Sequence, residues 1–116
     1  MRGLAVALGL MVAGGTMGGG LAAQQPDGPG LYAANCRFCH GRDGVPSASQ
    51  RATYKKIRAF SDSGSVATMS VDSVVTVLTK GIDQVMKSYS ERLTQAEIQA
   101  VAAYIKELAA KQPPKP

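Results

Sequence analysis

One short run constrains this chain more than any other feature. Cys36, Cys39 and His40 form the pattern C-x-x-C-H, and Gly41 follows directly. Two cysteines at this spacing lie about one helical turn apart, so both thiols can reach the vinyl groups along one edge of a haem. The histidine that follows can then place its imidazole beneath the iron. Since His40 is the only histidine and Cys36 and Cys39 are the only cysteines, the sequence predicts one haem c attached through these two cysteines, with His40 as an iron ligand.

Other uses of the C-x-x-C-H pattern have to be weighed against haem attachment. A structural zinc site needs four Cys or His ligands, usually from two paired half-sites, and no second pair occurs in this chain. A thioredoxin-like redox pair belongs in a βαβ unit, which the surrounding residues do not suggest. A plain Cys36–Cys39 disulfide in an exported module without haem stays open, because secreted chains with two cysteines often pair them.

The N-terminal segment has the features of an export signal. Arg2 gives it a positive start, an apolar stretch covers residues 4–12, and small residues at Ala22 and Ala23 offer a cleavage site. We therefore expect residues 1–23 to be a cleaved signal peptide. An uncleaved membrane anchor is the alternative, although the glycines in the second half of the segment make it a poor spanning helix.

The rest of the chain is long enough for one domain. We expect a folded domain over residues 24–110 and a flexible tail over residues 111–116, where three prolines prevent a helix. The formal net charge of the whole chain is +5. This bias is weak, and its Lys and Arg residues are not interleaved with stacking aromatic residues, so nucleic acid is not an expected partner.

Helix-start signals occur at three places along the domain. Asp27 or Gly28 can cap a helix that has Pro29 at its first position and runs into the cysteines. Ser70 or Asp72 can cap a second helix, which ends at Gly81. The spacing of Thr94 and Glu97 forms a capping box for a last helix with apolar residues at helical spacing up to Leu108.

The region between the first two of these helices has no regular pattern. Residues 51–58 are compatible with a turn of helix, and the rest of residues 47–69 is expected to be loop. A long irregular segment in a small domain is unusual unless it wraps a bound group. We interpret it as a wall around the haem.

These residues together resemble the class I c-type cytochromes, the small soluble single-haem carriers of bacteria and photosynthetic organisms. The matching stretches are residues 30–41, the segment 81–94 with its run at residues 86–93, and residues 101–106. The resemblance implies an all-α cytochrome c fold, in which three to four short helices wrap around one covalently attached haem and the N- and C-terminal helices cross. The resemblance also assigns residues to that crossing, namely Gly28 or Gly30, Tyr32 and Tyr104.

The second axial ligand of the iron is expected to be Met86. Met69 is the alternative, and either methionine could instead be ordinary core packing. Met86 stands in a connector between two helices and in the family's ligand position, but Lys87 follows it where many relatives have a proline. The resemblance further suggests that a carbonyl near Pro46, or that of Val45, accepts the N–H of the proximal imidazole.

The expected function is that of a one-electron carrier in the periplasm, and no enzyme motif is visible. Iron held by His40 and Met86 has no open position for a substrate, so electron exchange remains. The expected partners are redox proteins, either membrane electron-transfer complexes or terminal oxidoreductases. We expect a monomer without stable membrane insertion after cleavage. The alternative is a peroxidase-like or gas-binding haem protein in which Met86 is displaceable.

Overall fold

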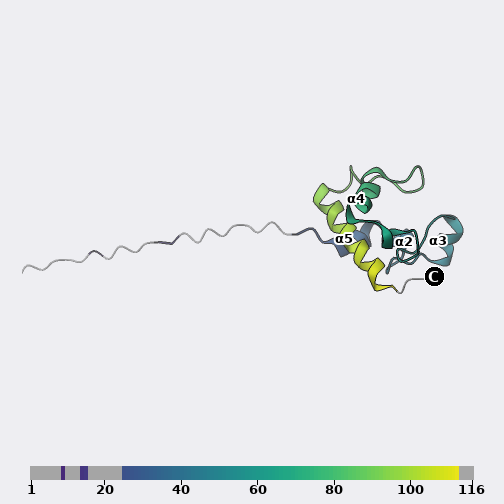
Figure 1. Ribbon diagram of the computed structural model, residues 1–116. Helices are drawn as coiled ribbons and strands as arrows, with labels where there is room; N and C mark the ends of the chain where they lie inside the picture. Colours follow the sequence, from purple (N-terminus) through teal and green to yellow (C-terminus); the bar gives the residue numbers. More distant parts are fainter. Residues whose placement is uncertain (1–8, 10–13, 16–24, 113–116) are drawn as a thin grey trace, which may run out of the picture.

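Short helices joined by turns make up the chain from residue 25 onward (Figure 1). The structure is a computed structural model, and it describes residues 9, 14–15 and 25–112. The helices are α1 (Gly28–Asn35), α2 (Arg37–His40), α3 (Ala48–Thr53), the 3-10 helix η1 (Val66–Thr68), α4 (Val71–Lys80) and α5 (Gln95–Lys111). Within the described residues there is no β-strand, only an isolated bridge between Ile82 and Met86.

Both ends of the chain extend beyond the described residues. The expected cleavage site at Ala22 or Ala23 lies outside them, as does most of the expected signal peptide and the end of the tail at residues 113–116. In the described part of the chain, no helix has the length and apolar character needed to cross a bilayer.

The predicted helix starts are confirmed by the capping bonds. The Asp27 side chain accepts a hydrogen bond from the Gly30 N–H at 3.0 Å, and the Ser70 hydroxyl accepts one from the Ser73 N–H. The capping box is complete, because Thr94 Oγ1 accepts from the Glu97 N–H at 3.1 Å and Glu97 Oε1 accepts from the Thr94 N–H at 3.0 Å. These local bonds satisfy N–H groups that have no partner inside the helix.

The expected continuous helix through the cysteines is wrong. α1 ends at Asn35, and Cys36, with φ −121°, separates it from the short helix α2. The N–H groups of Cys39 and His40 both bond to the carbonyl of Cys36, so the chain turns more tightly there than a continuing α-helix would. The expected turn of helix within residues 51–58 is also displaced, since α3 covers Ala48–Thr53.

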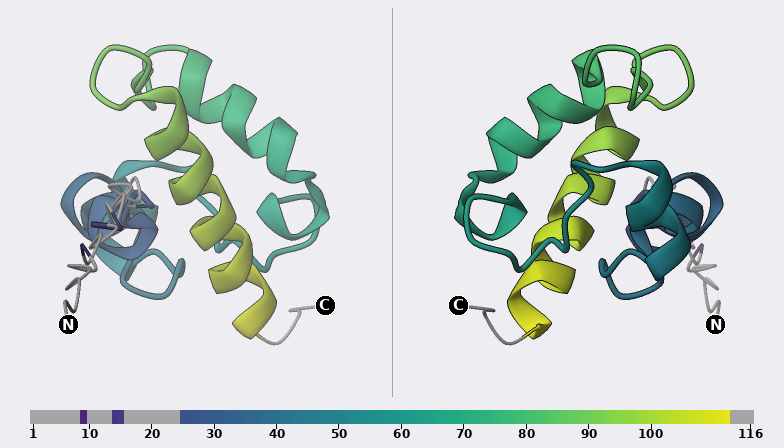
Figure 2. Two further views of the ribbon diagram at one scale, coloured as in Figure 1. Left: turned by 90° about the vertical axis from the view of Figure 1, so that its left-hand side faces the viewer. Right: turned by 90° about the vertical axis from the view of Figure 1, so that its right-hand side faces the viewer.

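α5 forms the centre of the core and has α1 on one side and α4 on the other (Figure 2). Its buried face carries Ile98, Val101, Ala102, Ile105, Leu108 and Ala109. α4 contributes Val74 and Leu78 to the same core. The apolar spacing in the sequence therefore identified the face of α5 that is buried.

The predicted crossing of the first and last helices is present. A Cβ built on Gly28 would lie 2.7 Å from the Ala100 carbonyl oxygen, so only a glycine allows the two backbones to approach this closely. Beside this contact the rings of Tyr32 and Tyr104 meet edge to face, with centroids 5.4 Å apart. Of the two candidate glycines, Gly28 is the one at the crossing, because Gly30 instead faces the capping carboxylate of Asp27.

Lys106 joins α5 to the segment around η1. Its ammonium donates hydrogen bonds to the carbonyls of Val66 at 3.0 Å, Ala67 at 3.1 Å and Met69 at 2.6 Å. The Val66 carbonyl also accepts the Met69 N–H, and the other two carbonyls lie at the end of the short helix η1, where carbonyl groups lack helical partners. One side chain of α5 therefore fixes the end of the segment that had no readable pattern in the sequence.

Candidate haem-binding site

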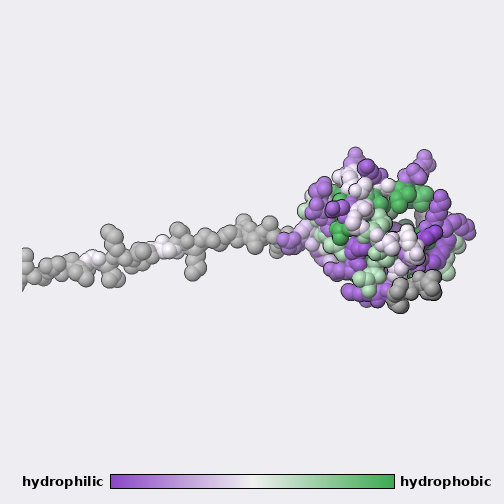
Figure 3. All heavy atoms as spheres, viewed as in Figure 1, coloured by the Kyte–Doolittle hydropathy of each residue, from purple (hydrophilic) through white to green (hydrophobic). Residues whose placement is uncertain are grey.

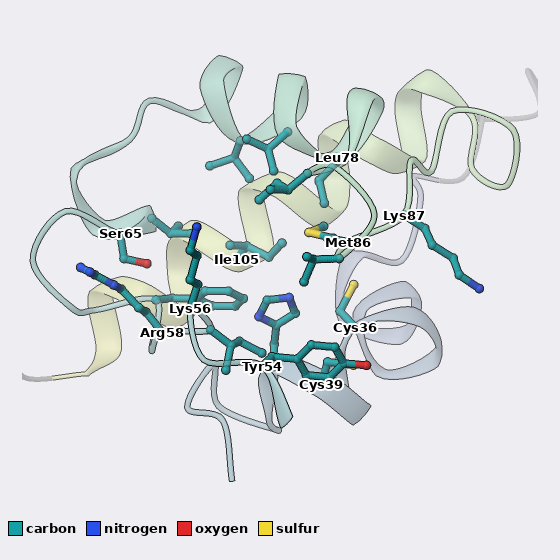
Figure 4. Close-up of a pocket in the computed structure, with 18 of the residues that line it drawn as sticks. Cys36, Cys39, Tyr54, Lys56, Arg58, Ser65, Leu78, Met86, Lys87 and Ile105 are labelled. Carbon is teal, nitrogen blue, oxygen red and sulfur yellow. The ribbon is translucent and has the colours of Figure 1, made fainter. Parts of the chain in front are cut away.

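A cavity of about 890 Å³ opens between the C-x-x-C-H segment, α4 and two connecting segments, residues 53–69 and residues 82–92 (Figure 4). Cys36, Cys39, His40 and Met86 all line it. Its size is near the upper end of the roughly 300–1,000 Å³ found for ligand sites. The structure thus brings together the four residues that the sequence selected.

The proximal side of this cavity is formed by His40 and Phe60. The two rings lie 5.1 Å apart between centroids and are tilted by 31°. Burial lowers the pKa of His40, so the imidazole is neutral and keeps a free lone pair for a metal. Its Nδ1 is buried and has no hydrogen-bond partner among the described residues. Phe60, which the sequence placed in a loop, is 5% exposed and restricts the ring's position by packing.

The expected acceptor for the proximal imidazole is not found in this structure. The Pro46 carbonyl accepts from Arg51 Nε at 3.2 Å, and in the described part of the chain no hydrogen bond joins His40 Nδ1 to Val45 or Pro46. α3 begins at Ala48, after the cap residue Ser47, and its Arg51 side chain turns back onto the Pro46 carbonyl.

The two cysteines lie beside the histidine as free thiols. Cys36 is buried and Cys39 is partly exposed. Burial, and to a smaller extent the neighbouring Cys39, raises the pKa of the Cys36 thiol to about 11. Two free thiols and a neutral imidazole at the edge of an apolar cavity fit the thioether and nitrogen attachments of haem c.

The opposite side of the cavity holds Met86, whose side chain points inward near Leu78 (Figure 4). Gly81 determines how the chain leaves α4 toward Met86. Its φ is +74°, and a Cβ at this position would lie 2.6 Å from the Met86 carbonyl oxygen, so only a glycine fits here. Ile82 and Met86 exchange backbone hydrogen bonds at 2.9 and 3.2 Å. Met69 lines the same cavity, so both candidate methionines are within it.

One contact at this site had no counterpart in the sequence analysis. The Tyr89 hydroxyl donates a hydrogen bond to the Asn35 carbonyl at 3.1 Å, across 54 positions of sequence. Burial raises the pKa of Tyr89, so the hydroxyl stays protonated and can donate. A tyrosine near the expected ligand was visible in the sequence, but its partner is a backbone group that no motif marks.

Comparison with known proteins places the chain in a family. Residues 23–105 match the family described as cytochrome C oxidase, cbb3-type, subunit III. The chain belongs to this cytochrome family. It is therefore a c-type cytochrome with covalently attached haem c, as the resemblance implied.

A curated relative of this subunit III family is the cbb3-type cytochrome c oxidase subunit CcoP of Cereibacter sphaeroides. The two sequences are 36% identical over 84 residues, which are 72% of this chain and 27% of that subunit. The chain thus spans about a quarter of the relative's length.

Solved structures agree with the cytochrome c fold of the subunit III family. The KustC0563 c-type cytochrome superposes with a TM-score of 0.62 at 28% identity, over 71% of this chain and 96% of that one. A tyrosine-to-phenylalanine mutant of the same cytochrome gives a TM-score of 0.61 at 27% identity, over 71% of this chain and 98% of that one. The predicted all-α cytochrome c fold is confirmed.

Proposed function

We propose that this protein is a one-electron carrier, with Cys36 and Cys39 forming the thioether bonds and His40 and Met86 as axial ligands. The observation that carries the proposal is that these four side chains line one cavity. When bound, the haem supplies reversible exchange between Fe(II) and Fe(III).

The side chains on the two faces of the cavity have different roles in this proposal. His40 offers a neutral nitrogen whose ring is held by Phe60. Met86 offers a soft thioether, which favours Fe(II) and raises the potential relative to a second histidine. With His40 and Met86 both bound to the iron, oxygen, peroxide or a substrate would have no free site there.

The absorption spectrum tests this ligation in the purified protein. We expect a six-coordinate low-spin ferric haem, and a ferrous form that does not bind carbon monoxide, because two strong axial ligands occupy the iron. A five-coordinate high-spin ferric form that takes up carbon monoxide on reduction would contradict the carrier and favour the peroxidase-like or gas-binding alternative.

The rim of the cavity has the composition of a docking surface for an acidic protein. Phe38, Ile82 and Val85 are large apolar residues with exposed fractions of 85%, 50% and 64%, and hydrophobic residues are exposed beside hydrophilic ones on the face seen in Figure 3. The basic residues lining the cavity are Lys55, Lys56, Arg58, Lys87 and Arg92. Asp83 is the single carboxylate among the described residues that line it. Such a positive rim would steer an acidic partner toward the haem edge.

Electron transfer to an acidic redox partner should slow as salt rises, because the ions screen the basic rim. Lys87 points away from the cavity (Figure 4), so Lys87→Glu should lower the rate several-fold at low salt without changing the visible spectrum. Stopped-flow mixing with a reduced or oxidised partner measures both effects.

Lys111→Glu is the matched control for this charge reversal. Lys111 is an exposed residue at the end of α5 and does not line the cavity. We expect its variant to keep most of the wild-type rate. Rates that do not change with salt, or equal losses in both variants, would contradict docking at this rim.

The proposed setting is the periplasm, with a membrane electron-transfer complex or a terminal oxidoreductase as partner. The support is that the relative CcoP is by name a subunit of a cbb3-type cytochrome c oxidase, and that residues 1–23 have the composition of an export signal. The boundary at Ala23 remains a prediction, which N-terminal sequencing of the protein from an exporting host would test.

A further inference from the structure

The break between α1 and α2 leaves the last carbonyls of α1, those of Ala33, Ala34 and Asn35, without a helical partner. In a continuing α-helix the N–H of Cys39 would bond to the carbonyl of Asn35. Here the Cys39 N–H bonds instead to the carbonyl of Cys36 at 3.2 Å, which also accepts the ordinary helical bond from the His40 N–H at 3.0 Å. The Asn35 carbonyl is therefore free to accept a hydrogen bond from elsewhere, directly before the first haem-binding cysteine.

Tyr89 supplies a hydrogen bond to this carbonyl from the other side of the cavity. Its hydroxyl donates to the Asn35 carbonyl at 3.1 Å, and its ring lines the cavity. Its backbone is fixed independently, since its N–H donates to the Leu78 carbonyl at the end of α4 at 2.9 Å. The side chain thus connects α4 and the segment that contains Met86 (residues 81–94, here the Met86 segment) to the last residue of α1, directly before Cys36.

The other hydrogen bonds of the Met86 segment do not reach the cysteine side. Ile82 bonds to Met86 within the segment, and the Ser88 hydroxyl donates to the Thr79 carbonyl of α4. Across the described residues, the Tyr89–Asn35 bond is the one hydrogen bond between residues 81–94 and residues 28–41.

We propose that the Tyr89 hydroxyl is a latch that holds the Met86 segment against the end of α1, directly before Cys36, and slows the departure of Met86 from the iron. This inference rests on the proposed ligation by Met86. Tyr89 acts here as a positioning residue, because it holds the ligand segment and is not itself a ligand. Without the hydroxyl, the Met86 segment keeps its hydrogen bonds to α4 but loses its hydrogen bond to Asn35 across the cavity.

Tyr89→Phe removes the hydroxyl and keeps the ring, so the fold and the covalent haem should be retained. The experiment mixes the ferric full-length protein with imidazole at increasing concentration. At saturating imidazole the observed rate constant of binding reaches a plateau, which equals the rate constant for dissociation of Met86 from the iron. We expect this plateau to rise about tenfold in Tyr89→Phe, as one hydrogen bond is lost, while the sulfur-to-iron charge-transfer band remains.

Tyr54→Phe is the matched control, because Tyr54 also lines the cavity and no hydrogen bond of its hydroxyl is found among the described residues. Its plateau should stay within about twofold of wild type. An unchanged plateau in Tyr89→Phe, or an equal rise in Tyr54→Phe, would overturn the latch while Met86 ligation stands. A wild-type protein that lacks the sulfur-to-iron band would overturn Met86 ligation itself, and is distinguishable from both results.

Discussion

Met86→Ala should abolish the weak sulfur-to-iron charge-transfer band of the ferric protein and let cyanide bind it, and carbon monoxide bind the ferrous protein. Alanine cannot coordinate the iron, so the position is left to water or an added ligand. The reduction potential should fall by on the order of a tenth of a volt or more, since axial ligands set haem potentials over a span of about 0.8 V. Visible spectroscopy and a redox titration measure these changes.

Met69→Ala is the control for the ligand assignment, because Met69 lines the same cavity. Its backbone carbonyl is held by Lys106 and its N–H bonds to Val66, and we expect its side chain only to pack. The Met69→Ala variant should therefore keep the charge-transfer band and exclude carbon monoxide. If this variant alone loses the band, the sixth ligand is Met69.

Gly28→Val should destabilise the protein strongly through the crossing of α1 and α5. The added Cβ would lie 2.7 Å from the Ala100 carbonyl oxygen, and because this neighbour is backbone, the two helices must separate. Overpacking of this kind costs about 1–3 kcal/mol of the free energy of unfolding. For a domain of this size that lowers the Tm by on the order of 10 °C, which circular dichroism of the haem-bound protein would detect.

Ala33→Val adds similar bulk on the exposed side of the same helix. It should cost only the lower helix propensity of valine, roughly 0.5 kcal/mol. If the two variants lose equal stability, the close approach at Gly28 is not what limits the helix crossing.

Much of the fold could be predicted because its signals are local. The capping box of Thr94 and Glu97 and the cap at Ser70 each depend on residues three positions apart, and both form as expected. The C-x-x-C-H run is equally local, and family membership confirms the covalent haem. Met86 was predicted as a ligand from its place between two helices. The structure puts it in the same cavity as His40, but Met69 lines that cavity too, so the structure does not distinguish the two methionines as ligands.

What could not be predicted depends on residues far apart in sequence or on backbone groups. The split at Cys36 is visible only in dihedral angles and hydrogen bonds. Phe60 packs on His40 from a segment with no pattern, and the Tyr89 hydroxyl meets a carbonyl 54 positions away. The choice of Gly28 over Gly30 likewise required the position of α5.

The three hydrogen bonds of Lys106 tie the segment around η1, beside the cavity, to a residue far along the chain. The carbonyls of residues 66, 67 and 69 accept from a donor that lies 37 to 40 positions later in the chain. Closing such a long loop carries an entropy cost that only the completed α5 can offset. These bonds can form only when α5 has packed, so the wall of the cavity around η1 is fully held only in the completed fold.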